Sequence, residues 1–213
     1  FADLDDLAHR LAVKIEALEP AYRNIDAVSS QDLVDSCGRH LSHVLHRLAG
    51  GPSGPFEIAR HTGRRRASQG LPLESVLHAF RIGGGFIWQE MLDRTPASQD
   101  RSLLKIAGDV WAATDEYSSA ITSGYREYTF EQAVHNQQVR SAVAASILDG
   151  SIDTEPRLSE SASLLRFPLA ASFVVVAAPT EEIGAEPLMG VESVLQAQDL
   201  TSAWHFAVPE QLG

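Results

Sequence analysis

Hydrophobic residues recur every three or four positions along most of the first 128 residues, and this spacing predicts amphipathic helices. The first helix is expected over residues 4–18, where Leu4, Leu7, Leu11, Ile15 and Leu18 form one stripe. Asp3 is placed to cap it, with Asp5 and Asp6 in the positive first turn. Pro20 and the polar residues 24–30 end it.

Two further helices are predicted on either side of a strong chain break. Ser29 and Asp32 have the spacing of a variant capping box, so the second helix is expected to begin after Ser29 or Ser30. Its apolar stripe continues to Leu48, and the glycines and prolines of residues 50–55 then interrupt the chain. Pro55 suits the first turn of a third helix, which is expected to end near Gly70.

The fourth helix, opened by Leu71 and Pro72 and extending to about Asp93, is predicted to lie at the centre of the core. Its main apolar face includes Phe80, Gly84 and Trp88, whereas Ile82 and Phe86 lie on the opposite face. A helix that is apolar on two sides is expected to be buried on both.

The pattern from Ser98 to Gly150 predicts helix throughout, because no proline interrupts it. Ser98 is expected to cap this helix. Residues 127–140 are nearly all polar, and the apolar spacing resumes in a shifted phase at Val139, Val143 and Ile147. Two interpretations remain open: one long helix with a solvated connector, or a break near Thr129.

The last part of the chain predicts a change of fold. Short helices are expected at residues 156–166 and 186–198, and strands at 171–178 and 201–208, where β-branched residues gather. The fold class is therefore mainly α: a helical bundle with a long connecting helix, followed by a truncated α/β segment. Two strands make a poor core on their own.

Charge and cysteine content narrow the function classes. The 213 residues carry a net charge of −11, of which −10 falls on residues 96–213. Such an acidic chain repels nucleic-acid backbones, although Arg64, Arg65 and Arg66 form a local exception. One cysteine, Cys37, excludes an intrachain disulfide and favours a cytoplasmic location. No stretch is apolar enough for a membrane span, and no signal peptide is visible.

The histidines and the cysteine are the residue types best suited to catalytic or metal chemistry, but their positions favour structural roles. His40, His43 and His46 sit three apart, but their helical phases diverge, which favours a solvated face over a metal site. Cys37 lies on the apolar stripe, where packing is its expected role. Because no catalytic motif is present, we expect no enzyme activity and no cofactor.

Two features suggest a small-molecule site. Gly83, Gly84 and Gly85 interrupt a helix, and either a close helix crossing, a ligand or a hinge would compensate for their low helix propensity. Polar side chains lie on or beside apolar faces of consecutive helices and need buried partners or an anionic ligand. The predicted ligand-binding residues are Arg65, Gln69, Arg81, Gly84 and Trp88. An internal carboxylate such as Asp115 or Glu116 could instead satisfy the arginines.

Residues 63–88 resemble the signature of the N-terminal sensor domain of PucR/CdaR-type transcriptional regulators, which is related to the N-terminal domains of RsbR-type stress proteins. The pattern R-A-x-Q-G-x-P-L, followed by A-[YF]-R-x-G, corresponds here to Arg66, Ala67, Gln69, Gly70, Pro72, Leu73, Ala79, Phe80, Arg81 and Gly83. The resemblance implies a globin-like bundle without haem over residues 1–130. It also implies a connecting helix over 131–154 and the start of a degenerate GGDEF-like domain over 155–213.

The resemblance implies the sensory and dimerising region of a cytoplasmic transcription regulator, with DNA bound only through a helix-turn-helix domain absent from this chain. A haem- or cofactor-binding globin-like sensor and a stressosome-like scaffold remain the alternatives. A homodimer is expected to pair partly through residues 117–148. The residues assigned to that surface are Tyr117, Ile121, Tyr125, Tyr128, Val139 and Val143.

Overall fold

The computed structural model describes residues 3–51, 56–96, 100–152, 154–177 and 190–205, with the backbone alone described over 100–105. The chain divides into two compact units, residues 1–131 and 132–213. The first contains helices α1 (Leu4–Leu18), α2 (Ala21–Asn24), α3 (Ser30–Leu48), α4 (Glu57–Ser68) and α5 (Leu73–Arg94). Helix α6 (Asp100–Leu148) begins in this first unit and is helical throughout, so the break near Thr129 is excluded.

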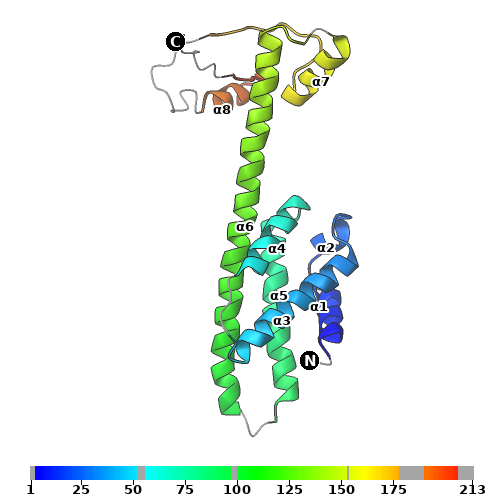
Figure 1. The fold of residues 1–213 in the computed structure, drawn as a ribbon, viewed down its shortest axis with the longest axis vertical. Helices are drawn as coiled ribbons and strands as arrows, with labels where there is room; N and C mark the ends of the chain where they lie inside the picture. The colour runs from blue at the N-terminus through cyan, green and yellow to red at the C-terminus, as the bar shows by residue number, and fades with distance from the viewer. Residues whose placement is uncertain (1–2, 52–55, 97–99, 153, 178–189, 206–213) are drawn as a thin grey trace. The chain divides into compact units, whose positions relative to one another are not determined.

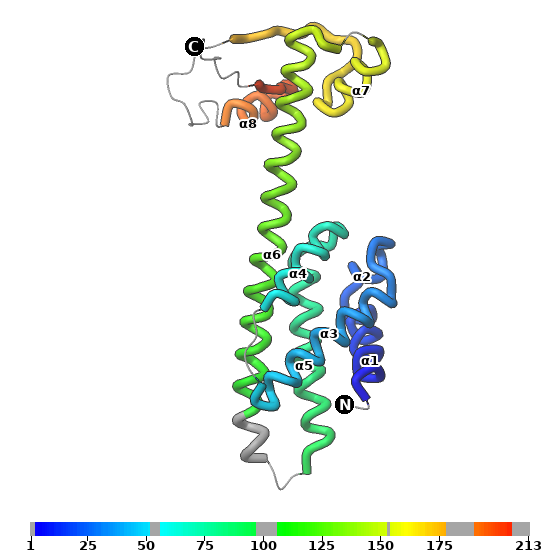
Figure 2. Tube along the Cα trace, in the orientation of Figure 1, coloured from blue at the N-terminus to red at the C-terminus, as the bar shows by residue number. Residues whose placement is uncertain are grey.

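The helices of the first unit surround one hydrophobic core. Figures 1 and 2 show α5 and the first part of α6 running antiparallel, with α3 crossing obliquely in front of α5. Helix α1 packs mainly against α3 and also contacts α5. As predicted, α5 is buried on two sides, because Val76 and Ile87 on one face and Ile82 on the other are all buried. A globin-like arrangement stays a prediction.

The helix boundaries follow from local sequence signals. The Ser29 Oγ accepts a hydrogen bond from the Asp32 backbone N–H, which confirms the predicted cap of α3. Asp3 occupies the predicted N-cap position of α1, but its side chain makes no capping hydrogen bond. Two predicted helix starts cannot be compared with the structure. Ser98, the cap predicted before α6, and Pro55, predicted in the first turn of the third helix, both lie outside the described residues.

The segment after α4 is a Schellman motif, which explains several residues of the R-A-x-Q-G-x-P-L pattern. Gly70 adopts a φ of +79°, its N–H bonds the Ala67 carbonyl, and the Leu71 N–H bonds the Arg66 carbonyl. Leu71 is fully buried, as the residue after such a glycine commonly is. Pro72 follows and fixes the entry into α5.

The second unit contains the end of α6, helix α7 (Glu155–Leu165) and helix α8 (Val191–Gln196). Leu165 and Ala144 are buried, and Arg140 donates to the carbonyls of Leu165 and Ser202. The predicted strands are wrong for the described residues 171–177 and 201–205, which form no ladder. The valines at 174–176 are exposed. Their β propensity alone does not make a strand, because a strand needs a neighbouring backbone to pair with.

Candidate functional site: a buried cavity among helices α3 to α6

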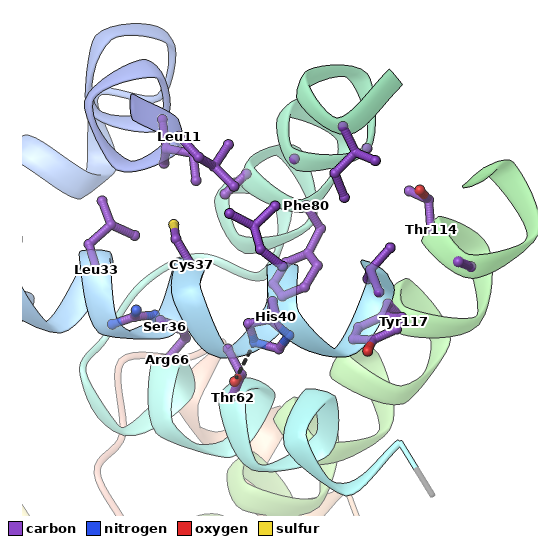
Figure 3. A pocket seen from close by; sticks show the side chains of 18 of the residues that line it. Leu11, Leu33, Ser36, Cys37, His40, Thr62, Arg66, Phe80, Thr114 and Tyr117 are labelled. Atoms are coloured by element: carbon purple, nitrogen blue, oxygen red, sulfur yellow. Dashed lines mark hydrogen bonds between the residues drawn. The ribbon is translucent and has the colours of Figure 1, made fainter. Parts of the chain in front are cut away.

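A cavity of about 70 Å³ lies among the core helices of the first unit. Helix α3 contributes Cys37 and His40, α4 contributes Thr62, α5 contributes Phe80, and α6 contributes Tyr117, while α1 adds apolar side chains. Figure 3 shows His40 between Thr62 and Tyr117, with Phe80 above it. The walls are mainly hydrophobic, so each polar atom that reaches the cavity needs a partner.

His40 is the central polar residue of this cavity. It is buried, so the solvated face predicted for the three histidines is wrong at this position. Its Nε2 lies 2.9 Å from the Thr62 Oγ1, and the Thr62 hydroxyl donates to the Ile58 carbonyl. Burial lowers the pKa of His40 to about 3, with further contributions from Arg39 and Arg66. The imidazole is therefore neutral at physiological pH.

Tyr117 stands among aromatic rings from three other helices or their flanks. Its ring lies 5.7 Å from His40 and 5.6 Å from Phe56 in edge-on arrangements, and it stacks on Phe80 at 6.4 Å. Tyr117 is 2% exposed and Ile121 is fully buried, so assigning them to an exposed dimer stripe is wrong. Burial raises the pKa of the Tyr117 hydroxyl to about 12, so the group stays protonated.

A buried ion pair borders the cavity. The Arg66 side chain is 2% exposed, and its Nη1 lies 2.7 Å from the Asp32 Oδ2 and 2.8 Å from the Gln69 Oε1. The guanidinium also lies 5.6 Å from the Tyr22 ring centroid. Burial raises the pKa of Asp32, but hydrogen bonds from Gln69 and Arg66 and nearby positive charge outweigh it and leave the pKa lowered.

The three consecutive arginines therefore join helices. Arg64 pairs with Glu131 on α6, whereas Arg65 and Arg66 both pair with Asp32 on α3. Glu116, one of the two carboxylates considered as an internal partner, pairs instead with Arg47. The local basic run thus has partners inside the protein.

The five residues predicted to bind a ligand are not brought together. Gly84 lines the cavity, whereas Arg65 and Gln69 contact Asp32 in the first turn of α3. Arg81 is exposed on α5, and Trp88 is half-buried away from the cavity lining. Sequence reasoning missed His40, Thr62 and Tyr117. The available signal was helical phase, because His40 lies between Cys37 and Val44 on the apolar stripe.

Close helix crossings hold the cavity walls in place. A Cβ added at Gly84 would lie 2.6 Å from the Thr114 Oγ1 on α6, so the crossing predicted there is present. A tighter crossing, between α4 and α6, was not predicted. A Cβ at Gly63 would lie 2.1 Å from the Ile121 carbonyl oxygen, and one at Gly124 would lie 2.1 Å from the Arg60 carbonyl oxygen. Helices α4 and α6 therefore touch through their backbones.

The other residues assigned to a dimer surface have varied environments. The Tyr125 hydroxyl donates to the Leu71 carbonyl at 2.9 Å, which ties α6 to the Schellman turn. Tyr128 is half-buried in the first unit. Val139 and Val143 are half-buried within the second unit. Larger apolar exposure on α6 occurs instead at Trp111, Phe130, Val134 and Leu148.

Membrane-spanning helices and metal-binding clusters are both absent from the described residues. None of their helices combines the length and hydrophobicity needed to cross a membrane. No group of three or more histidine, cysteine, aspartate or glutamate side chains within the described ranges is arranged to hold a metal ion.

The fold and cavity define a helical bundle domain with a partly polar interior. The chain belongs to the family described as "RsbT co-antagonist protein rsbRD N-terminal domain", which matches residues 5–140. This membership suggests a sensory or regulatory role. No curated protein and no solved structure shows a significant match to the chain.

Proposed function

We propose that this chain is the sensory and dimerising region of a cytoplasmic PucR-type transcriptional regulator and relays a signal to a DNA-binding domain outside it. The family match supports the sensory part. The R-A-x-Q-G-x-P-L pattern, which the structure uses to end α4 and to bury Arg66, supports the PucR-type part. Residues 155–213 would then begin a degenerate GGDEF-like domain.

The observation that carries the proposal is the position of α6. Tyr117 and Thr114 on this helix line the cavity, and the same helix continues to Leu148, beyond the bundle. A change in cavity occupancy would therefore act directly on the element that leaves the sensor domain. Helix shifts of this kind are an established way to pass a signal between sites.

A non-enzymatic role fits the protonation states around the cavity. His40 is neutral with a pKa of about 3, and burial raises the pKa of the Cys37 thiol to about 12. A general base or nucleophile works best with a pKa near the operating pH. The pKa values of His40 and Cys37 lie far from that pH, and so does the raised pKa of Tyr117. The chemistry favours binding over catalysis.

DNA binding by the natural protein that contains this chain tests the proposal. The purified protein is incubated with fragments of its own genome, and the recovered fragments are sequenced. We expect a small set of enriched sites, with affinity that falls steeply as salt rises. Recovery no greater than that of a protein-free background would contradict a transcription-regulator role.

A stressosome-like scaffold is the second candidate, and the family description as an RsbT co-antagonist favours it. A scaffold would show no enriched DNA and would form large assemblies in light scattering. A globin-like haem sensor is less compatible with the interior, because a 70 Å³ cavity is far below the roughly 300–1,000 Å³ of pockets for larger ligands. A visible absorption spectrum with a haem band would overturn that reasoning.

A further inference from the structure

Two buried polar atoms at the cavity have no hydrogen-bond partner within the described protein: the His40 Nδ1 and the Tyr117 hydroxyl oxygen. Both side chains line the cavity, and their ring centroids lie 5.7 Å apart. Leaving such atoms unpaired destabilises a folded protein, so native structures rarely do so. Their position on one cavity indicates that something occupying it supplies the missing bonds.

The hydrogen bonds around Thr62 determine what His40 offers. The Thr62 hydroxyl has one hydrogen, which it donates to the Ile58 carbonyl. It must therefore accept from the His40 Nε2, which lies 2.9 Å away. In a neutral imidazole with a proton on Nε2, the Nδ1 is an acceptor. The cavity thus presents an acceptor at His40 and, at Tyr117, a hydroxyl that can donate.

The charges around the cavity call for a neutral occupant. Arg66, the charged side chain in the lining, is already paired with Asp32 and Gln69. His40 and Tyr117 are both neutral, as their pKa values of about 3 and about 12 require. An ion entering these mainly apolar walls would lose its hydration without gaining a counter-charge.

The size of the cavity limits the occupant further. An apolar cavity of about 150 Å³ accommodates a benzene ring. At about 70 Å³, this cavity has half that volume and suits a molecule of roughly four non-hydrogen atoms. The aromatic faces of Phe80 and Tyr117, which stack at 6.4 Å, favour a flat one.

We propose that this cavity binds a small, neutral, planar molecule with both a hydrogen-bond donor and an acceptor, as in a primary carboxamide. Its N–H donates to the His40 Nδ1, and its oxygen accepts from the Tyr117 hydroxyl. The assignment deepens the proposed sensory function and rests on it for its biological meaning. The binding itself does not depend on whether the natural protein contacts DNA.

Three probes of nearly equal shape test the chemistry on the unmodified chain. Acetamide is neutral and has a donor and an acceptor; acetone lacks the donor; acetate carries a charge. Amide chemical shifts are followed by NMR during titration with each. We expect saturable shifts at cavity-lining residues with acetamide, in the millimolar range because so few atoms make contact. Acetone should bind about tenfold more weakly, and acetate should give no saturable shift.

A variant pair tests the assigned contacts. Tyr117→Phe removes the hydroxyl and keeps the ring, and should weaken acetamide about tenfold, which corresponds to one hydrogen bond. Tyr125→Phe is the control, because its hydroxyl bonds the Leu71 carbonyl away from the cavity.

Three results would overturn the assignment: equal responses to all three probes, shifts outside the cavity, or unchanged affinity in Tyr117→Phe. Each would indicate that ordered water alone satisfies the two atoms. Because these outcomes are read on the isolated chain, failure here would leave the DNA-binding test unaffected.

Discussion

Arg66 is the residue whose removal should most damage the first unit, because Arg66 and Asp32 form a buried ion pair. Arg66→Met would leave the Asp32 carboxylate buried without its main partner and should lower the free energy of unfolding by about 3–5 kcal/mol. Arg65→Met is the matched control. Arg65 contacts the same carboxylate but is 40% exposed, so its loss should change stability by about 1 kcal/mol or less. Urea denaturation measures both, and equal effects would contradict the buried-pair account.

His40 should make the stability of the bundle depend on pH. Its pKa is about 3 in the folded protein and roughly 6.5 when unfolded, so below pH 6.5 the unfolded chain binds a proton that the folded protein does not. Stability is therefore complete above pH 6.5 and falls with acidification. Between pH 7.5 and pH 5, His40 should account for a loss of about 2 kcal/mol.

The variant His40→Gln isolates that contribution, because glutamine can still donate to the Thr62 hydroxyl but does not titrate. Urea denaturation at the two pH values should show a pH dependence smaller by about 2 kcal/mol than in the wild type. The same pH dependence in both proteins would show that the ring is hydrated and titrates normally.

At the scale of elements, the backbone contact between α4 and α6 should tolerate no side chain. Gly63→Ala would place a Cβ 2.1 Å from the Ile121 carbonyl oxygen, which belongs to a helix and cannot rotate away. We expect the free energy of unfolding to fall by about 1–3 kcal/mol or more. Gly85→Ala meets nothing within 4 Å and should be neutral or stabilising by about 0.5–1 kcal/mol. Thermal denaturation distinguishes them, and a Gly63→Ala protein as stable as Gly85→Ala would contradict the crossing.

The cost of adding a side chain at Gly84 should depend on the size of that side chain. Its nearest neighbour is the Thr114 hydroxyl, which donates to the Val110 carbonyl and can move only by breaking that bond. Gly84→Leu should therefore destabilise the bundle by about 1–3 kcal/mol or more through overpacking. A melting temperature equal to that of the wild type would instead favour a hinge or ligand role for this glycine.

The helices were predictable because their signals are local. The apolar spacing of residues 4–18, the Ser29 cap and the glycine after α4 each act within a few residues, and α1, α3 and α4 end close to where expected. A strand, in contrast, needs a backbone partner that is distant in sequence. The valine run at 174–176 therefore predicted a strand, but no ladder forms among the described residues there. Likewise, the cavity depends on which faces of several helices meet. Helical phase could place His40 on the buried face of its own helix, but not opposite Thr62 and Tyr117.

At the scale of the whole molecule, we keep the homodimer as a proposal but move its surface. Tyr117 and Ile121 are buried in the core. In contrast, Phe130 is 70% exposed, and Val134 lies one turn further along α6. Phe130→Glu combined with Val134→Glu should halve the mass measured by light scattering at tens of micromolar. Trp111→Glu, at another exposed position, is the control. A monomeric wild type, or a double variant that still pairs, would contradict this surface.

The central claim is that the bundle senses a molecule in its cavity and reports through α6. Hydrogen–deuterium exchange of the whole chain, with and without saturating acetamide, tests it most directly. We expect slower exchange at the cavity-lining part of α6 around Val110 to Tyr117, continuing along the helix into residues 132–148. Acetone at the same concentration should produce little change. Exchange along α6 that is unaltered by acetamide, or altered equally by both probes, would contradict the account.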